Sequence, residues 1–220
     1  MYLLAVDTSG RQGSIALCQG DAKSFETLGL CMLEGGAYSA RLVPCIADLF
    51  EQTNLAKNQL DGVIVVDGPG SFTGLRVGLS TVKALCEALG KPLAAVSMLE
   101  ALAVIYGHDG EVVTAVLDAG RGELYVGEYE VRENWARLVR QSIEKLDGFV
   151  ERPSRQKSRI ITTFEKFADG AVTLVDPLQA DAVARIGLRK LLAGETVDPA
   201  TLDANYIRRS DAELFSQPKR

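Results

Sequence analysis

A glycine-rich loop is the first feature of the sequence that suggests chemistry. Residues 68–74 read Gly-Pro-Gly-Ser-Phe-Thr-Gly and lie between a β-branched apolar run and a helical pattern. Backbone N–H groups in such a turn, with the N-terminus of the next helix, can hold an anion. The loop is neither a P-loop nor a dinucleotide fingerprint, because Leu75-Arg76 follows it and its glycines are spaced G-x-G-x-x-x-G. The glycines could equally serve only to turn the chain tightly and pack the helix on a sheet.

Two aspartates, Asp7 and Asp118, each end an apolar strand pattern just before a Gly-Arg turn. If they face one cleft, the pair could hold Mg²⁺ through water beside bound phosphates. Alternatively, each carboxylate caps only its own turn. The sequence therefore offers a candidate nucleotide- or anion-binding site in the two turns and the glycine loop. Its members are Asp7, Thr8, Ser9, Gly68, Gly70, Ser71, Thr73, Gly74, Asp118 and Gly120.

Other reactive groups are scarce. His108 is the only histidine, so a metal site with two histidines cannot form within one chain. No G-x-S-x-G elbow surrounds a serine, and protease activity therefore lacks a nucleophile–base pair. The four cysteines have no C-x-x-C spacing and lie in apolar segments, which predicts reduced core residues rather than ligands or disulfides. We expect neither a catalytic residue nor a metal site.

Composition indicates an ordinary globular chain. The 220 residues are 47% hydrophobic and 24% charged, which excludes a collagen, a coiled coil or a disordered protein. A net charge of −5 is unsuited to gripping nucleic acid alone. The N-terminus lacks a basic region, and no apolar run reaches the roughly 18 residues that span a bilayer. We expect a cytoplasmic protein that does not bind membranes.

The pattern of apolar residues predicts an alternating α/β chain. The first half begins with strands expected at 3–6, 13–18 and 28–33 in an antiparallel meander, followed by a helix from the cap candidate Ser39 to residue 52. We then expect a buried strand at 63–66, a helix at 74–89, a strand at 93–96, and a helix opened by a capping box at Ser97. In the second half we expect strands at 112–117, 124–131, 160–163 and 172–175, a short helix and exposed loop within 141–159, and a helix ending near Gly194.

The two halves resemble each other. Asp7 and Asp118 stand 111 residues apart, half the chain, and each lies between an apolar strand and a returning strand. This spacing predicts a duplicated unit and a cleft between two lobes.

Three segments together resemble the TsaB (YeaZ) family, bacterial proteins required for threonylcarbamoyladenosine in tRNA. They are the Asp-Thr-Ser hairpin, Gly-Pro-Gly-Ser-Phe-Thr-Gly-Leu-Arg-Val-Gly at 68–78, and Asp118-Ala-x-x-Gly-Glu-Leu-Tyr. The likeness is strong over 1–130, weak over 135–195, and returns at Tyr206-Ile207-Arg208. The chain departs from the family pattern at Tyr38, Gly120 and Ala204, where His, Arg and Pro are frequent.

The resemblance implies an α/β fold of the two-lobe actin-like ATPase type (ASKHA, ribonuclease H-like), with mixed sheets and flanking helices. It places the N-terminal lobe at 1–107 and the C-terminal lobe at 108–220, with the terminal segment packing back on the first lobe. It implies a non-catalytic subunit that binds and activates the paralogous transferase TsaD and recruits the ATPase TsaE. Contact with tRNA would occur only through the complex.

The same resemblance implies that the partner, or a second copy, binds the N-lobe helices. The candidate contact residues are Leu42, Ile46, Leu49, Phe50, Arg76, Leu79, Val82 and Lys83. No intrinsic cofactor is expected, and ATP or ADP with Mg²⁺ would bind at the complex interface. The alternative function is that of an actin-fold small-molecule kinase or nucleotide hydrolase, in which the two aspartate turns and the glycine loop cradle phosphates and Mg²⁺.

Overall fold

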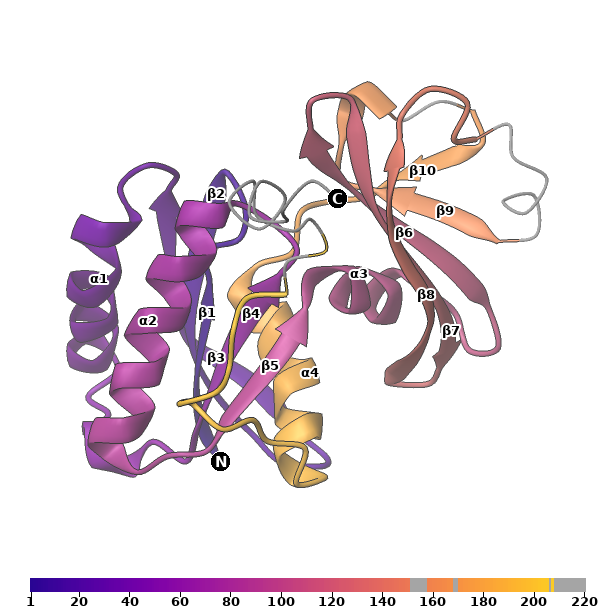
Figure 1. The fold of residues 1–220 in the computed structure, drawn as a ribbon. Helices are drawn as coiled ribbons and strands as arrows, with labels where there is room; N and C mark the ends of the chain where they lie inside the picture. The colour runs from indigo at the N-terminus through magenta and orange to yellow at the C-terminus, as the bar shows by residue number, and fades with distance from the viewer. Residues whose placement is uncertain (151–157, 168–169, 206, 208–220) are drawn as a thin grey trace, which may run out of the picture.

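The structure is a computed structural model that describes residues 1–150, 158–167, 170–205 and 207. Its ribbon forms two lobes, each built on a five-stranded sheet (Figure 1). Tyr206 and Arg208, which contributed to the family resemblance, lie outside the described residues.

The first sheet combines an antiparallel meander with two parallel strands. Its strands are β1 (Tyr2–Asp7), β2 (Gln12–Gly20), β3 (Phe25–Glu34), β4 (Gly62–Gly68) and β5 (Leu93–Ser97), arranged in the order β3-β2-β1-β4-β5. Strand β4 runs parallel to β1, and β5 runs parallel to β4. The β-branched residues 63–66 are at most 1% exposed, as expected for a strand covered on both faces.

The second sheet repeats this topology. Its strands are β6 (Val112–Gly120), β7 (Glu123–Arg132), β8 (Trp135–Lys145), β9 (Arg159–Thr162) and β10 (Val172–Leu174), arranged in the order β10-β9-β6-β7-β8. Strands β6 to β8 form the meander, and β9 and β10 add in parallel beyond β6. The shared strand order confirms the predicted repeat of one unit.

One predicted element is wrong. Residues 141–145, predicted within a segment of short helix and exposed loop, complete strand β8. This strand pairs only with β7 and lies at the edge of the sheet, so much of it is exposed. Its polar residues therefore conceal the apolar alternation that marks a strand buried on one face.

The helices follow the predicted order with small shifts at their starts. They are α1 (Tyr38–Gln52), α2 (Phe72–Leu89), α3 (Met98–Tyr106) and α4 (Ala180–Leu192), with short 3-10 turns η1 (Lys57–Gln59) and η3 (Glu165–Phe167). Helix α2 begins two residues before 74, because the Ser71 hydroxyl caps it by accepting from the Gly74 N–H at 3.2 Å. The predicted cap Ser39 is wrong, because it lies inside α1. Ser97 is the N-cap residue of α3 as predicted, but its side chain makes no capping hydrogen bond.

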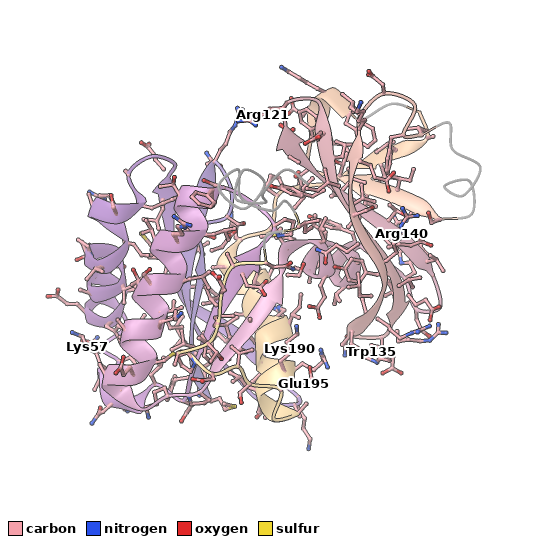
Figure 2. All side chains as sticks on the ribbon, in the orientation of Figure 1. Lys57, Arg121, Trp135, Arg140, Lys190 and Glu195 are labelled. Atoms are coloured by element: carbon pink, nitrogen blue, oxygen red, sulfur yellow. The ribbon has the colours of Figure 1, made fainter. Side chains whose placement is uncertain are left out.

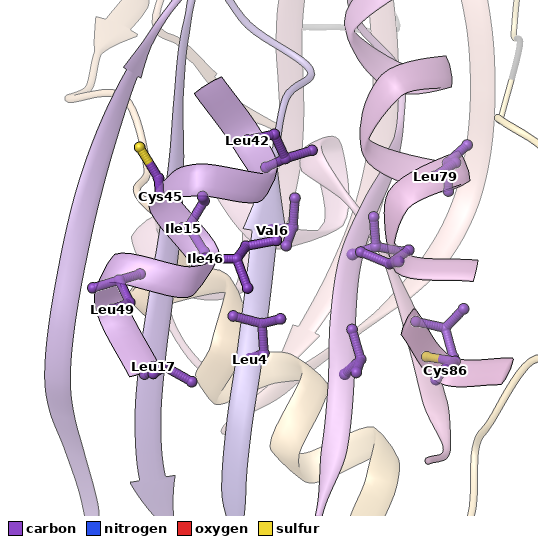
Figure 3. Packing of buried hydrophobic residues seen from close by; sticks show 14 of the residues in the cluster. Leu4, Val6, Ile15, Leu17, Leu42, Cys45, Ile46, Leu49, Leu79 and Cys86 are labelled. Carbon is purple, nitrogen blue, oxygen red and sulfur yellow. The ribbon is translucent and has the colours of Figure 1, made fainter. Parts of the chain in front are cut away.

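Helices α1 and α2 cover one face of the first sheet. Their buried side chains meet those of β1, β2 and β4 in one apolar cluster, part of which Figure 3 shows. Leu42 and Leu49 of α1 and Val82 of α2 are each at most 2% exposed. In Figure 1 the two helices lie on the side of the first lobe that faces away from the second.

The other two helices exchange lobes. Helix α3 follows the first sheet in sequence, yet Leu99 and Leu102 are buried in a cluster with Val113 and Tyr129 of the second sheet. Helix α4 follows the second sheet, yet its side chains pack on the uncovered face of the first. The division into lobes at 107/108 stays a prediction, and α4, which that division assigns to the second lobe, packs on the first.

Residues 197–205 run back along the first lobe. The Val197 N–H donates to the Leu93 carbonyl at 2.9 Å, and the Asn205 N–H donates to the Asp67 carbonyl at 2.8 Å. Lys83 Nζ donates to the Leu202 carbonyl at 2.8 Å. This strap, residues 197–205, therefore follows the outer edge of the sheet beside β5.

Among the described residues, no helix has the length and apolar character needed to cross a bilayer.

The exchange of helices predicts that a change in α4 destabilises both lobes. Ile186 is 2% exposed and Leu192 is 50% exposed. Ile186→Ala should lower the free energy of unfolding by about 2–5 kcal/mol, because the vacated volume lies in the core. Leu192→Ala, on the same helix, should cost less than about 1 kcal/mol. Urea unfolding would be followed by far-UV circular dichroism and by fluorescence of Trp135, the single tryptophan, which lies on β8.

Both signals should shift together in Ile186→Ala. A tryptophan transition that stays at its wild-type midpoint would show that the lobes unfold independently.

Candidate functional site

The turn between β1 and β2 is the centre of the predicted anion site. Asp7 is 3% exposed, and its Oδ1 accepts from the Ser9 N–H at 2.8 Å and from the Ser9 hydroxyl at 2.7 Å. Burial raises the pKa of Asp7, against the lowering effect of these two bonds. The carboxylate therefore caps its own turn.

The glycine loop packs directly on this turn. The Ser71 N–H donates to the Ser9 carbonyl at 2.7 Å, and the Thr8 hydroxyl donates to the Gly74 carbonyl at 2.8 Å. A Cβ at Gly70 would clash with the Ser9 carbonyl, and one at Gly74 would clash with the Thr8 carbonyl. The structure thus brings Asp7–Ser9 together with the loop as predicted.

These contacts favour the packing interpretation of the glycines. The Ser71 N–H bonds to Ser9 and the Gly74 N–H bonds to Ser71, so two donors of an anion cradle are already used. Gly68 has φ +136°, which only glycine adopts readily, and it lies against the carbonyl of Asn205. Thr73 is exposed at the start of α2.

The second aspartate turn repeats the first in the other lobe. Asp118 is exposed, and its Oδ1 accepts from the Gly120 N–H at 2.8 Å, just as Asp7 accepts from Ser9. Gly120 has φ +70°, a left-handed conformation that glycine adopts readily. The alternative in which each aspartate caps its own turn therefore describes both carboxylates. The described residues contain no group of three or more His, Cys, Asp or Glu side chains placed to hold a metal ion.

Asp67 is a polar residue that the sequence analysis did not assign to the site. It lies near the end of β4, directly after the buried residues 63–66, and its Oδ1 is buried without a hydrogen-bond partner. The pKa of Asp67 is raised to about 6, chiefly by burial, with Lys190 lowering it and Glu100 raising it. An acidic residue directly after a run of four buried β-branched residues is the signal that could have identified it.

The surroundings of Asp67 join both exchanged helices. Lys190 Nζ on α4 donates to Glu100 Oε2 on α3 at 2.8 Å and to the Ala95 carbonyl of β5 at 3.1 Å. Figure 2 labels Lys190 on α4. Tyr129 of β7, whose pKa is raised chiefly by burial, also senses the charges of Glu100 and Asp67. A polar junction of Asp67, Glu100, Tyr129 and Lys190 thus lies where the two lobes meet.

Comparison with known proteins identifies the family. The sequence model of TsaD, described as tRNA N6-adenosine threonylcarbamoyltransferase, matches residues 35–198. The TsaB protein of Bacillus subtilis (strain 168) is 34% identical over 132 residues, which are 60% of this chain and 56% of that protein. The chain belongs to this family, in its TsaB (YeaZ) group.

A second TsaB protein and two solved structures agree. TsaB of Escherichia coli (strain K12) is 31% identical over 136 residues, 61% of this chain and 57% of that protein. The chain thus spans little more than half the length of these TsaB relatives. A Pseudomonas aeruginosa protein described as similar to peptidase YeaZ is 26% identical, with a TM-score of 0.75 over 94% of this chain and 99% of that one. YeaZ from Pseudomonas aeruginosa, 24% identical, has a TM-score of 0.76 over 94% and 100%. The two-lobe actin-like (ASKHA) fold is confirmed.

The partner-binding residues expected from the TsaB resemblance lie mainly in the core. Six apolar candidates face the first sheet and are at most 7% exposed: Leu42, Ile46, Leu49, Phe50, Leu79 and Val82. The Arg76 guanidinium lies over the Phe72 ring at 3.8 Å, and Lys83 bonds to the strap. The location of the predicted surface is therefore corrected, because apolar spacing on these helices marks the side that packs on the sheet.

Other residues form the outer face of α1 and α2 in this TsaB-group chain. We define the α1–α2 outer face by eight exposed uncharged residues, which are Ala40, Val43, Pro44 and Ala47 on α1 and Phe72, Ser80, Ala84 and Ala88 on α2. Val43 is 59% exposed and Phe72 is 44% exposed. The α1 residues have the spacing i, i+3, i+4, i+7 of one helix side. Small and apolar side chains at such positions let another helix approach closely.

Asp67 predicts a distinctive pH dependence of stability. Because its pKa is raised from 3.8 to about 6, the folded chain binds a proton more tightly than the unfolded chain does. The free energy of unfolding should therefore fall as the pH rises through the window from about 4 to 6, by up to about 2–3 kcal/mol at 1.4 kcal/mol per pKa unit. Asp67→Asn should remove this loss. Urea unfolding of both chains between about pH 4 and 7.5 measures the difference.

The variant should gain on the wild type as the pH rises and lose that advantage near pH 4. A difference in stability that does not change with pH would contradict the placement of Asp67 as a buried, unpaired carboxyl group.

Proposed function

We propose that this chain is the non-catalytic partner subunit of a complex that forms N6-threonylcarbamoyladenosine at the tRNA adenosine 3′ to the anticodon. In this proposal it binds and activates a TsaD-type transferase and recruits a TsaE-type ATPase. Two relatives at 34% and 31% identity are named tRNA threonylcarbamoyladenosine biosynthesis protein TsaB, which supports the pathway.

The α1–α2 outer face is the observation that carries the proposed role. It presents exposed small and apolar side chains on two neighbouring helices, with Val43 at 59% and Phe72 at 44% exposed. Exposed apolar side chains gathered on one side of a molecule can mark an interaction site. A paralogous transferase of the same fold would present helices of its own, so a helix-on-helix interface fits the chemistry of both sides. The same face would serve self-association when the partner is absent.

The polar sites support a binding role over a catalytic one. The carboxylate of Asp7 and the backbone donors of Ser71 and Gly74 are engaged within the chain. Asp118 bonds to its own turn in the other lobe. In the proposal, ATP or ADP with Mg²⁺ binds at the complex interface, and tRNA, which a chain of charge −5 would grip poorly, is contacted through the complex.

A charge on the α1–α2 outer face should break the complex without unfolding the chain. We expect Val43→Glu to weaken binding to the TsaD-type transferase of the same organism at least about tenfold, because the carboxylate would be desolvated in the interface. Isothermal titration calorimetry measures binding, and a tRNA modification assay with purified components measures function. Circular dichroism should show a native fold, since the side chain is exposed.

Val139→Glu is the matched control. Val139 is 50% exposed on β8 of the second lobe, so the same change there should leave binding and modification unaltered. Equal affinities of the two variants would show that the partner does not use α1 and α2. Analytical ultracentrifugation of the same pair tests whether a homodimer uses this face.

Nucleotide turnover separates the proposal from the kinase or hydrolase alternative. The purified chain alone should hydrolyse no appreciable ATP in the presence of Mg²⁺, measured as phosphate release. Substantial turnover that is lost in Asp118→Asn would favour the alternative, because that residue would then act on phosphates rather than cap its turn.

A further inference from the structure

The cysteines are the one set of reactive side chains that the proposed function leaves unused. All four are free thiols, and Cys18, Cys45 and Cys86 are buried. Cys31 differs because it is only half-buried, packing at the border of the cluster that contains Cys45. Cys31 lies on β3 and Cys45 lies on α1, fourteen residues later (45 − 31).

The packing of α1 on β3 sets these two residues opposite each other. Alternate residues of β3 face the helix. Leu33 is 2% exposed, whereas Leu30 and Met32 are 39% and 49% exposed on the other side. A Cβ at Gly29 would lie 2.9 Å from Leu49 Cδ2.

The next residues of β3 and α1 that face each other, beyond Gly29 and Leu49, are the two cysteines. Cys31 follows Gly29 by two residues, about 6.7 Å along a strand. Cys45 precedes Leu49 by four residues, about one helical turn or 5.4–6 Å. Figure 3 shows Cys45 and Leu49 on the same side of α1. The facing pair Gly29–Leu49 is therefore followed by the facing pair Cys31–Cys45.

The thiols are close enough to interact. Cys45 lies near enough to Cys31 to raise the pKa of its thiol, and the Cys31 Sγ donates to the Met32 carbonyl at 3.7 Å. Burial, and then Cys45, raise the pKa of Cys31 to about 11. Among the charged neighbours on α1, Asp48 also raises this pKa and Arg41 lowers it. Few thiolates are present at neutral pH, so oxidation of this pair is slow there and accelerates in alkaline solution.

We propose that Cys31 and Cys45 form a site for a reversible intramolecular disulfide, made by exchange with a low-molecular-weight disulfide such as oxidised glutathione. The half-buried Cys31 thiolate attacks one sulfur of the small disulfide and expels a small thiolate. The Cys45 thiolate then attacks Cys31 Sγ in the mixed disulfide and expels the second. Each protein thiol releases one proton, and two small thiols result, so the small disulfide is reduced as the protein pair is oxidised.

The cross-link would fix α1 to β3. It closes a loop of about 15 residues, and a loop closure of this kind restricts the unfolded chain. The link lies on the inner side of α1, so it leaves the residues of the outer face uncovered. This inference is independent of the proposed function.

Peptide mapping tests the site directly. The native full chain is incubated with oxidised and reduced glutathione at pH 8.5, trapped with N-ethylmaleimide and digested with trypsin. Cleavage after Lys23, Arg41 and Lys57 separates Cys31 (peptide 24–41) from Cys45 (peptide 42–57). We expect one linked peptide pair, an initial rate that rises about tenfold per pH unit between pH 7 and 9, and a Tm that rises by at least about 3 °C on oxidation.

Matched variants keep the test decisive. Cys45→Ser should stop at the glutathione adduct of Cys31, while Cys86→Ser should link as the wild type does. The proposal is overturned if the native wild type yields only the adduct, or if linkage appears only in urea. Pairing of Cys31 with Cys18 or Cys86 would overturn it as well.

Discussion

The exchange of α3 and α4 between the sheets is the constraint on which the molecule depends. The first sheet has α1 and α2 on one face, and α4, together with Met98 and Ala101 of α3, buries its other face. Helix α3 in turn buries one face of the second sheet. Neither sheet is therefore covered by helices from its own half of the chain alone. The ion pair between Lys190 and Glu100 joins the exchanged helices at the point where they meet.

The repeat has diverged in the layer that faces solvent. After its fourth strand the first lobe carries the long helix α2, whereas between β9 and β10 the described residues of the second lobe carry only the turn η3. There the outer face of the second sheet is covered by Phe149 and Phe167, whose rings meet edge to face at 5.5 Å. A two-helix surface is thus described on the first lobe, and it is there that we propose the partner binds.

The sequence predicted the fold where local pattern and tertiary environment agree. The β-branched run at 63–66 predicted a strand buried on both faces. The Gly-Arg turns that follow Asp7 and Asp118 predicted the repeat. The prediction failed at β8, because residues 135–145 form an edge strand whose exposed polar side chains weaken the alternation of apolar and polar residues.

The site was predictable in its membership but not in its contacts. Glycine spacing indicated that a backbone approaches the loop closely, yet only the structure shows that this backbone is the chain's own Thr8–Ser9 turn. Apolar spacing on α1 likewise could not tell the residues that pack on the sheet, such as Leu42, from a surface offered to a partner. Asp67 was missed because its surroundings include Lys190 of α4, more than a hundred residues away in sequence.

The position of α4 near the end of the chain has a consequence for biosynthesis. Residues 1–107 leave the ribosome before α4 does, and in that interval the sheet face formed by Leu3, Ile64 and Val96 lacks the helix that buries most of it. This apolar surface stays exposed until residue 192 has left the ribosomal exit tunnel, because α4 covers it in the folded chain. Chaperones that shield apolar surface would therefore meet the nascent first lobe in the interval before α4 has been made.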